Sequence, residues 1–460
     1  MGILGRLFGT DGVRGVVNKG LTVETALKLG LAIGSWLGPG ARVLVGRDVR
    51  AGGDAIMHAV VAGLEASGAR VYIAGLAPTP ALQYAVRRHG FDAGVMVTAS
   101  HNPPEYNGVK VIAADGIEVP REAEREIEEI FFSERWRLAS WRSLVHDAQP
   151  WPGVVDEYVD AVASMIDEEV VRRRGYRVVV DAANSVGALA TPRVLQRLGV
   201  KVYTMNGDLN PLFPGREPEP TPETLRETSM VVRSLGADLG VGHDGDADRA
   251  IIIDERGEVW WGDRSGALLA AYVSEQHPEL PKRVFTGVSS SILVEEYLSR
   301  FNIEVRWTPV GSVVISRMLV KEGGVAGFEE NGGYMHPLHQ PVRDGAMTTA
   351  LFLEMMAREG VKASELFARL PRYYPVKTKI PMDRSTALQV LEEVKKRYSG
   401  YRMVTIDGVK VFGDGWWFLV RPSGTEPVLR IMVEARSREE AQRIAEELKK
   451  LVLEIAASRR

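Results

Sequence analysis

The fold is decided by RVLVGRDVRAGGDAIMHAVVAGLEASGARVYIAGL, residues 42–76, which alternates apolar strand-like runs with a helical stretch. Arg42–Val45 is a short apolar run that ends at Gly46, a helix follows from about Asp54, and Val71–Ala74 is the next run. The alternation extends outward to a helix before this stretch and to a helix and a strand after it: Thr22–Leu37, Pro80–Arg88 and Ala93–Val97. The order β-α-β-α-β predicts a mostly parallel sheet covered by helices.

The same order then returns twice along the chain. The second pass comprises strand 177–181, helix 187–198, strand 201–204, helix 222–235 and a strand that reaches GHDGDADR at 242–249. The third has strands near Val284 and Val305, helices near Leu293 and Ile315, and a strand near Val325. In each of the three passes, one strand ends in a polar loop. Because ligands gather at the carboxyl ends of strands in open α/β sheets, we expect these three loops to converge on one cleft.

The last part of the chain has another pattern. At residues 371–382 the sequence changes to PRYYPVKTKIPM, and helix, paired strands and a final helix follow, which predicts a separate α+β domain. A chain of 460 residues is too long for one hydrophobic core. We therefore predict three similar mixed α/β domains, 1–150, 151–250 and 251–368, and a C-terminal α+β domain, 369–460.

Composition excludes several classes of protein. No apolar run approaches the roughly 20 residues of a membrane span, and no basic head with an apolar core marks a secretion signal, so we expect a cytoplasmic protein. The absence of cysteine excludes disulfides, thiolate metal sites and a cysteine nucleophile. A net charge of −3 provides no field that would recruit nucleic acid. Any anion site must therefore be local.

GHDGDADR carries the strongest chemical signal. Asp244, Asp246 and Asp248 alternate with small residues, so an extended loop directs all three carboxylates to one hard cation. A solvated acidic turn is the alternative, but the mutual repulsion of the carboxylates makes a cation-free role costly. An EF-hand is rejected, because Arg249 stands where its sharp turn needs glycine. Few protein ligands and open positions suit Mg²⁺ that shares its shell with phosphate, and Arg249 beside it could bind an anion.

Ser100 ends a strand in TASHNPPEYNGVK, residues 98–110, where prolines and asparagines predict a rigid, exposed turn. Its hydroxyl is a candidate nucleophile, with a plain turn residue as the alternative. His101 is not expected to act as its base, since adjacent side chains do not normally point at each other. The chain also lacks a G-x-S-x-G nucleophile elbow, so a hydrolase triad is not predicted.

Three further loops carry anion-binding or sugar-binding groups. RPSGTEP at 421–427 offers the parts of a phosphate cradle, and the alternative is a hairpin turn. FGTDGVRG at 8–15 supplies an arginine in a glycine-rich turn. FEENGG at 328–333 supplies side chains suited to bind sugar hydroxyls, and a solvated turn is the alternative. The candidate residues of the three loops are Arg421, Ser423, Gly424, Thr425, Arg14, Glu329 and Asn331.

Together these stretches resemble the α-D-phosphohexomutase family, which includes phosphoglucomutases, phosphomannomutases and phosphoglucosamine mutases. TASHNP resembles its phosphoserine loop, DGDADR its magnesium loop, FEENGG its sugar loop and RPSGTEP its phosphate loop, in the family's order. The resemblance covers essentially the whole chain and implies a heart-shaped, four-domain protein with one loop from each domain in a central cleft. FPGREPEPTPETL at 213–225 and the EENGG ending look closer to archaeal members.

The resemblance also implies a mechanism. Ser100 would be a phosphoserine whose phosphate shares Mg²⁺ with the three aspartates, and a hexose 1,6-bisphosphate would be intermediate and activator. Magnesium and Arg14 would neutralise charge on the transferring group. Lys110 matches a family lysine and would be a general acid or base if cationic neighbours lower its pKa. His101 also belongs to the catalytic candidates.

Two departures from the family pattern are visible. Many bacterial members have a histidine at the end of the sugar loop, where this chain has Gly333, so His336 or His339 is a candidate substitute for proton transfer. GRDVRAGG at 46–53 has alanine and glycine where relatives commonly have a hydroxyl residue.

The leading expectation is therefore a phosphoglucomutase/phosphomannomutase acting on hexose phosphates, without nucleic acid or membrane partners and with homo-oligomerisation left open. Phosphoglucosamine mutase is the competitor within the family. A metal-dependent glycosyltransferase would share the Asp-x-Asp metal site but needs no phosphoserine. A calcium-stabilised binding protein would explain the acidic loop alone.

Overall fold

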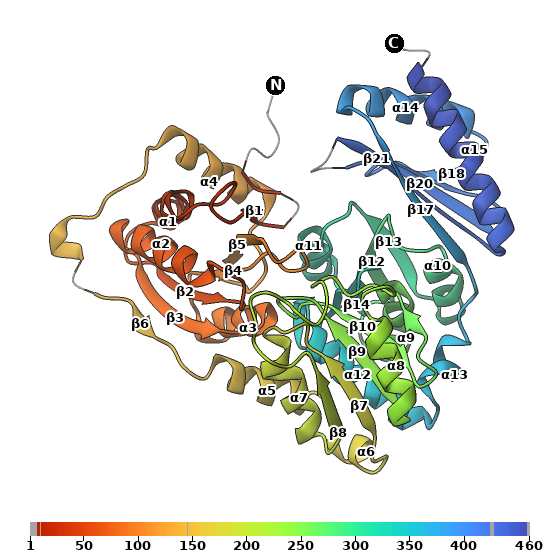
Figure 1. Cartoon of the computed structure of the whole chain (residues 1–460), viewed down its shortest axis with the longest axis horizontal. Coiled ribbons are helices and arrows are strands. Elements are labelled where there is room, and N and C mark those ends of the chain that lie inside the picture. The colour runs from red at the N-terminus through yellow and green to blue at the C-terminus, as the bar shows by residue number, and fades with distance from the viewer. Residues whose placement is uncertain (1–6, 10, 145, 424–426, 458–460) are drawn as a thin grey trace.

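The chain forms four sheets, three of them flanked by helices and the fourth antiparallel (Figure 1). The structure is a computed structural model that describes residues 7–9, 11–144, 146–423 and 427–457. The first three sheets come from residues 13–150, 177–260 and 283–343, and the fourth from residues 374–435. The predicted fold class, three mixed α/β units followed by an α+β unit, is confirmed.

The first unit contains residues 42–76. Its elements are β1 (Val13–Val16), α1 (Val23–Leu37), β2 (Arg42–Arg47), α2 (Gly53–Ala66), β3 (Arg70–Leu76), α3 (Thr79–His89), β4 (Ala93–Val97), β5 (Tyr106–Ala113) and α4 (Arg121–Ser133). Thr22 caps α1 by accepting from the amide of Thr25. Helices α1 and α2 touch through glycines, because a Cβ at Gly30 would lie 2.2 Å from the Val60 carbonyl oxygen. A short 3₁₀ turn, η1 (Trp141–Ser143), and β6 (Gln149–Pro150) complete the unit.

The second unit follows helices α5 (Val154–Ser164) and α6 (Glu168–Arg172). It comprises β7 (Arg177–Asp181), α7 (Gly187–Arg197), β8 (Lys201–Met205), α8 (Arg226–Leu235), β9 (Leu239–His243), β10 (Ala250–Asp254) and β11 (Val259–Trp260). The helix predicted from residue 222 begins only at Arg226. Thr224 donates its amide to the Thr221 hydroxyl, and this local turn delays the helix.

The third and fourth units complete the chain. The third has α9 (Gly262–Gln276), β12 (Arg283–Gly287), α10 (Leu293–Leu298), η2 (Ser299–Phe301), β13 (Glu304–Thr308), α11 (Ser312–Glu322), β14 (Ala326–Phe328), β15 (Tyr334–His336), β16 (Gln340–Arg343), α12 (Gly345–Glu359) and α13 (Ala363–Phe367). The fourth has β17 (Tyr374–Pro381), α14 (Arg384–Arg397), β18 (Arg402–Val404), β19 (Val409–Phe412), β20 (Trp416–Pro422), β21 (Val428–Ala435) and α15 (Arg438–Ala457).

The first three sheets share one strand order. They contain the runs β5-β4-β2-β3, β10-β9-β7-β8 and β15-β14-β12-β13. In each run three strands are parallel, and the fourth returns antiparallel to the last of them. The connection at that reversal is a short loop at the carboxyl end of a parallel strand. The expected repeat therefore exists, and it places one polar loop at the same position of each sheet.

Packing joins the first three units more closely than the fourth. One hydrophobic core runs from α3 through α5 and α7 to α9 and α12, a second lies between α1, α2 and the first sheet, and the fourth unit has a core of its own. The third and fourth units meet at a small apolar cluster of Val288, Phe412, Trp417 and Leu419. Figure 1 shows the fourth unit, in blue, at the upper right beside the third.

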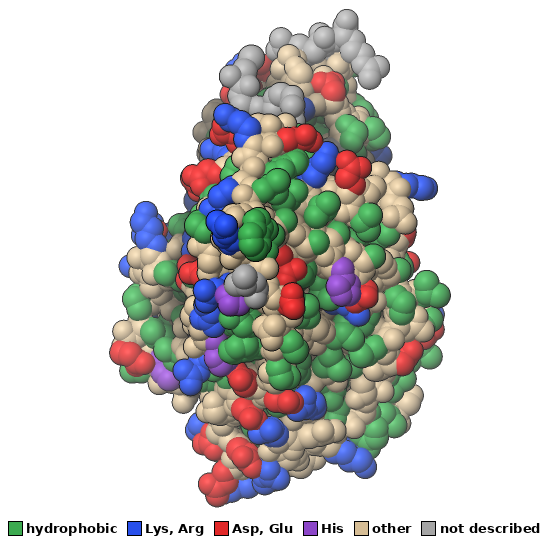
Figure 2. Space-filling view, turned by 90° about the vertical axis from the view of Figure 1, so that its left-hand side faces the viewer, with side chains coloured by type: hydrophobic (Ala, Val, Ile, Leu, Met, Phe, Trp, Pro, Cys, Tyr) green, Lys and Arg blue, Asp and Glu red, His purple; other side chains and the backbone are tan. Residues whose placement is uncertain are grey.

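No helix within the described residues is both long and apolar enough to span a membrane. Figure 2 shows one face of the molecule, on which basic, acidic and apolar side chains are interspersed. That face carries no field of a single sign.

Candidate active site

The polar loops of the three repeated units lie at the strand reversals. Residues 98–105 connect β4 to β5, residues 244–249 connect β9 to β10, and residues 329–333 connect β14 to β15. Contacts join them: Ser100 meets Asp244 across the first and second units, the Ala250 amide donates to the Gly332 carbonyl at 3.0 Å, and Arg343 of β16 meets both Asp248 and Glu329. The convergence expected from strand topology is present for these three loops.

Ser100 is held in an unusual backbone conformation. Its φ is 51°, in the left-handed region that a side chain rarely adopts, and its amide donates to the Thr98 hydroxyl at 2.8 Å. Its Oγ donates to Asp244 Oδ2 at 2.7 Å. Ser100 is fully buried rather than exposed, because the second unit covers its loop. A strained, locked hydroxyl directed at a carboxylate cluster is suited to chemistry at one fixed point.

Arg50 fixes the shape of the serine loop. Its guanidinium donates to four backbone carbonyls of that segment, those of Ser100 at 2.6 Å, Asn102 at 2.7 Å, Pro103 at 2.9 Å and Tyr106 at 3.0 Å. It also pairs with Asp48 at 3.2 Å, and both side chains are fully buried. Sequence reasoning missed this residue. The signal was present in GRDVRAGG, where two charged residues directly follow a buried strand.

The three aspartates form the carboxylate cluster in which a metal ion could be held. Each offers an oxygen within 4.8 Å of the others, and all three are buried. Burial, with Asp248 and Asp246 adding to it, raises the pKa of Asp244 well above its usual value. Asp246 Oδ1 and Asp248 Oδ1 are buried without a hydrogen-bond partner among the described residues. Unpaired carboxylate oxygens of this kind fit a hard, oxygen-seeking cation such as Mg²⁺.

An EF-hand is excluded by the neighbouring structure. The isoleucines after the loop form the buried strand β10. Glu255, which would be the last EF-hand ligand, instead accepts the Ser364 amide at 3.1 Å.

Lys110 is surrounded by acids, which contradicts the expectation of cationic neighbours that lower its pKa. Its Nζ lies 2.9 Å from Asp246 Oδ2, 3.2 Å from Asp248 Oδ2 and 3.2 Å from Asp11 Oδ2. Burial lowers the pKa of Lys110, but the three carboxylates outweigh it and the pKa is raised. A lysine held protonated can donate a proton or a hydrogen bond. It is not a general base in this arrangement.

His101 and Arg249 lie beside the serine. Arg249 Nη2 is 2.9 Å from His101 Nδ1, and Ser100 Oγ is 3.4 Å from the same nitrogen. The adjacent side chains do approach each other, contrary to expectation, because the left-handed backbone at Ser100 turns them together. Burial and then Arg249 lower the pKa of His101 well below its usual value, so the ring is neutral. Arg249 donates to Nδ1, which leaves that nitrogen poorly placed to take the serine proton.

Arg14 lies at the edge of this cluster. Its Nη1 donates to Asn102 Oδ1 at 2.8 Å, and its Nη2 pairs with Asp11 Oδ2 at 2.9 Å. The predicted arginine of the glycine-rich turn is therefore in contact with the serine loop.

The sugar loop reaches the cluster through Glu329. This side chain is buried and lies 3.4 Å from Arg343 Nη1, and the Asn331 side chain accepts the amide of Gly333 at 3.2 Å within the loop. Arg343 also binds Asp248 Oδ2 at 2.6 Å. Arg343 is the second residue that sequence reasoning missed, since nothing in the flanking PVRDG marks it.

The phosphate loop belongs to the hairpin between β20 and β21. Arg421 Nε donates to Asp407 Oδ2 at 2.8 Å, and the Ser423 amide donates to the Val428 carbonyl. Gly424 and Thr425 lie outside the described residues. Strands β20 and β21 on either side pair antiparallel, and both the cradle and the alternative hairpin turn remain predictions.

The two histidines after the sugar loop occupy other surroundings. His339 Nε2 is 3.4 Å from Asp344, and its ring stacks on Tyr84. His336 is buried in β15, and burial lowers its pKa to about 3. Among the described residues neither histidine contacts the carboxylate cluster, so the structure does not support them as substitutes for a histidine at residue 333.

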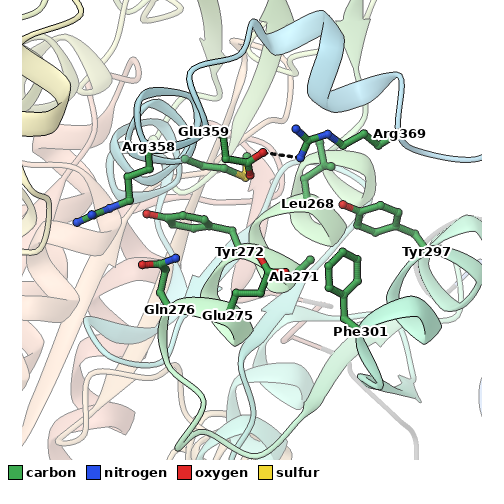
Figure 3. Close-up of a pocket in the computed structure, with 11 residues that line it drawn as sticks. Leu268, Ala271, Tyr272, Glu275, Gln276, Tyr297, Phe301, Arg358, Glu359 and Arg369 are labelled. Atoms are coloured by element: carbon green, nitrogen blue, oxygen red, sulfur yellow. Dashed lines mark ion pairs between the residues drawn. The ribbon is translucent and has the colours of Figure 1, made fainter.

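A cavity of about 410 Å³ lies elsewhere, between α9, α10 and α12 (Figure 3). None of the predicted site residues lines it. Its arginines are neutralised, since Arg369 pairs with Glu359 at 2.5 Å and Arg358 with Asp167 at 3.0 Å. We assign it no role in the chemistry.

A buried hydroxyl on a carboxylate cluster, with Lys110, Arg249 and Arg343 around it, is an arrangement suited to metal-assisted phosphoryl transfer. Comparison with known proteins gives the family. The chain matches all four phosphoglucomutase/phosphomannomutase domains: alpha/beta/alpha domain I at 5–138, domain II at 156–257, domain III at 261–374 and the C-terminal domain at 378–451.

Relatives agree over the whole length. The phosphoglucosamine/phosphogalactosamine mutase of Sulfurisphaera tokodaii is 54% identical over 98% of this chain and 99% of its own. The phosphoglucomutase/phosphomannomutase of Thermococcus kodakarensis is 41% identical over 96% and 97%. A crystal structure of a phosphoglucomutase/phosphomannomutase family protein from Burkholderia thailandensis superposes with a TM-score of 0.86, 25% identity and coverage of 98% and 97%. The chain belongs to the phosphoglucomutase/phosphomannomutase family, the α-D-phosphohexomutases, and is a mutase.

Proposed function

We propose that the chain interconverts the 1-phosphate and 6-phosphate of a hexosamine, with glucosamine as the preferred sugar, through a phosphoserine at Ser100. The observation that carries the proposal is the 2.7 Å contact of Ser100 Oγ with Asp244 Oδ2, inside the carboxylate cluster. A serine in this position can carry a phosphoryl group whose oxygens complete the shell of a cation.

Asp244, Asp246 and Asp248 are the proposed ligands of Mg²⁺. When bound, the ion would neutralise negative charge on the transferring phosphoryl group. The chain's own cations add to this effect. Arg249 lies 3.7 Å from Asp244 Oδ2, and protonated Lys110 can donate to a phosphoryl oxygen or to the leaving oxygen of the sugar.

The remaining loops are proposed to hold the sugar phosphate. Glu329 and Asn331 would accept and donate hydrogen bonds to sugar hydroxyls, and Arg421 with Ser423 would bind the phosphate that is not reacting. Phosphoryl transfer from Ser100 to the free hydroxyl would give a hexose 1,6-bisphosphate. This intermediate would turn around and return its other phosphate to Ser100.

The choice of sugar rests on the relatives. The relative with an amino-sugar name shares 54% of residues and the one named for glucose and mannose shares 41%. We therefore place glucosamine first, ahead of the glucose and mannose expected from sequence, which remain the second candidate. Membership in a mutase family sets aside the glycosyltransferase and the binding protein.

The test compares initial rates on the 1-phosphates of glucosamine, glucose and mannose, with the matching 1,6-bisphosphate present. We expect the largest kcat/KM for glucosamine 1-phosphate. A larger value for glucose or mannose would select the second candidate, and no turnover of any hexose phosphate would refute the mutase proposal for this chain.

Intact mass tests the nucleophile. Wild-type protein should gain one phosphoryl group on incubation with the bisphosphate, and Ser100→Ala should gain none and lose turnover. Ser140→Ala is the matched control, because Ser140 is exposed on the connector before β6 and should leave both properties unchanged. Phosphorylation of Ser100→Ala to the wild-type extent would disprove the assignment.

A further inference from the structure

The end of the sugar loop has no room for a side chain. A Cβ built at Gly333 would lie 2.4 Å from Cδ and 2.8 Å from Cγ of Arg343. The backbone of Gly333 is not in the left-handed region, so space rather than conformation requires glycine here. The aliphatic stem of Arg343 therefore fills the volume that a residue with a side chain would take at position 333.

The guanidinium of Arg343 connects segments from three units. It lies 2.6 Å from Asp248 Oδ2 in the second unit, 2.8 Å from Asp11 Oδ2 in the first, and 3.4 Å from Glu329 Oε2 in the sugar loop. Its side chain is 5% exposed. A planar fork with several donors can serve three carboxylates at once, which a lysine ammonium cannot do with the same geometry.

Arg343 and Lys110 both bind one oxygen of Asp248, whereas the other oxygen makes, within the described chain, only a 3.9 Å ion pair with Arg249 Nε. Oδ2 receives Arg343 at 2.6 Å and Lys110 at 3.2 Å. Oδ1 has no hydrogen-bond partner among the described residues. Asp246 follows the same rule, because its Oδ2 receives Lys110 and its Oδ1 is unpaired. Residues that orient a metal ligand through its other atom control metal affinity strongly.

We propose that Arg343 is a positioning residue that couples the sugar loop to the metal loop. By binding Asp248 Oδ2 it leaves Oδ1 available to a cation, and it meets Glu329, the proposed acceptor of sugar hydroxyls. A sugar that engages Glu329 changes the contact between Glu329 and Arg343, and Arg343 transmits that change to Asp248. The inference rests on the proposed function for the identity of the sugar loop. Because coupling is reciprocal, sugar phosphate and metal should each alter the affinity of the other.

The experiment measures Mg²⁺ binding by titration calorimetry on dephosphorylated protein, with and without glucosamine 6-phosphate. In wild type the sugar phosphate should change the Mg²⁺ dissociation constant by at least about 5-fold, the lower end of typical coupling. Arg343→Lys keeps the charge but loses the fork, so it should weaken Mg²⁺ binding about 10-fold or more, and its coupling should fall below about 2-fold.

Arg317→Lys is the matched control. Arg317 also joins the third unit to the first, through Asp115 and the Glu118 carbonyl, but the structure gives it no contact with the metal loop among the described residues. It should bind Mg²⁺ like wild type. Gly333→Ala is the second variant, since it displaces the stem of Arg343 without removing a charge, and it should reproduce the weakened binding.

Three results would overturn the inference: Arg343→Lys with wild-type affinity and coupling, an equal loss in Arg317→Lys, or no effect of the sugar phosphate on Mg²⁺ binding in wild type. If Arg343→Lys shows no melting transition, it is not folded, and the Mg²⁺ affinity of Gly333→Ala then tests the inference instead. Failure of the proposed function is seen separately, as absent turnover or absent phosphorylation of Ser100, because the calorimetry needs neither.

Discussion

Arg50→Met tests whether one buried arginine holds Ser100, the proposed nucleophile, in place. The change removes four hydrogen bonds to carbonyls of residues 100–106 and the ion pair with Asp48. Met keeps most of the side-chain volume, so the effect reports lost polar contacts rather than a cavity.

The magnitude follows from what is left behind. Breaking a fully buried ion pair costs about 3–5 kcal/mol, because the remaining charge has no partner. Each carbonyl left without a donor adds about 1–3 kcal/mol, less where water replaces the arginine. We expect a loss of at least about 4 kcal/mol in the free energy of unfolding of the first unit.

Burial raises the pKa of Asp48 to about 6, and Arg50 opposes this rise. Without Arg50 the pKa should rise further, so Asp48→Asn in the Arg50→Met background should recover part of the lost stability. That recovery distinguishes a stranded charge from a general packing defect.

Two quantities are measured: urea unfolding followed by circular dichroism, and kcat for the interconversion of hexose 1-phosphate and hexose 6-phosphate. Since the carbonyl of Ser100 is one of the lost acceptors, kcat should fall by about 100-fold, as expected for misplacement of a reacting group. Arg70→Met is the control, because Arg70 is exposed at the start of β3 and should change stability by less than about 0.5 kcal/mol. A loss below about 1 kcal/mol in Arg50→Met, or an equal loss in the control, would refute the reasoning.

Three further predictions concern acid stability, the metal and the phosphate loop. Burial lowers the pKa of His336 to about 3 and that of His243 to about 4. Below about pH 6.5 both histidines are protonated in the unfolded chain but stay neutral in the folded chain. The free energy of unfolding should therefore fall from there towards pH 4, by about 2 kcal/mol per histidine at pH 5. A urea midpoint that does not change between pH 7 and pH 5 would contradict this. Asp246→Ala should lose activity that excess Mg²⁺ does not restore, and a magnesium titration that recovers wild-type kcat would remove this residue from the metal site. Arg421→Ala frees Asp407 and should weaken the apparent affinity for hexose phosphate by about 1.5–3 kcal/mol, whereas an unchanged KM would refute the cradle.

Much of the fold could be read from local pattern. Amphipathic helices such as α1 and short apolar strands such as β4 repeat a period in the sequence, and the structure has them at the expected residues. Helices α9 and α12 were not anticipated, because they are buried on all sides from Gly262 to Ser274 and from Gly345 to Ala357. A helix that is buried on every side has no single apolar face, so its sequence lacks that periodic signal.

The order of the units and the chemistry of the carboxylate loop follow from the sequence without any structure. Three aspartates at alternate positions need no partner from elsewhere to predict a cation site, and strand order predicts where their loop lies. Tertiary structure alone decided the surroundings of those groups. Lys110 is protonated because acids from two other segments surround it. The side chain of Arg343 fills the volume that a side chain at position 333 would need, although ten positions separate the two residues. Such contacts depend on long-range packing, which no local spacing encodes.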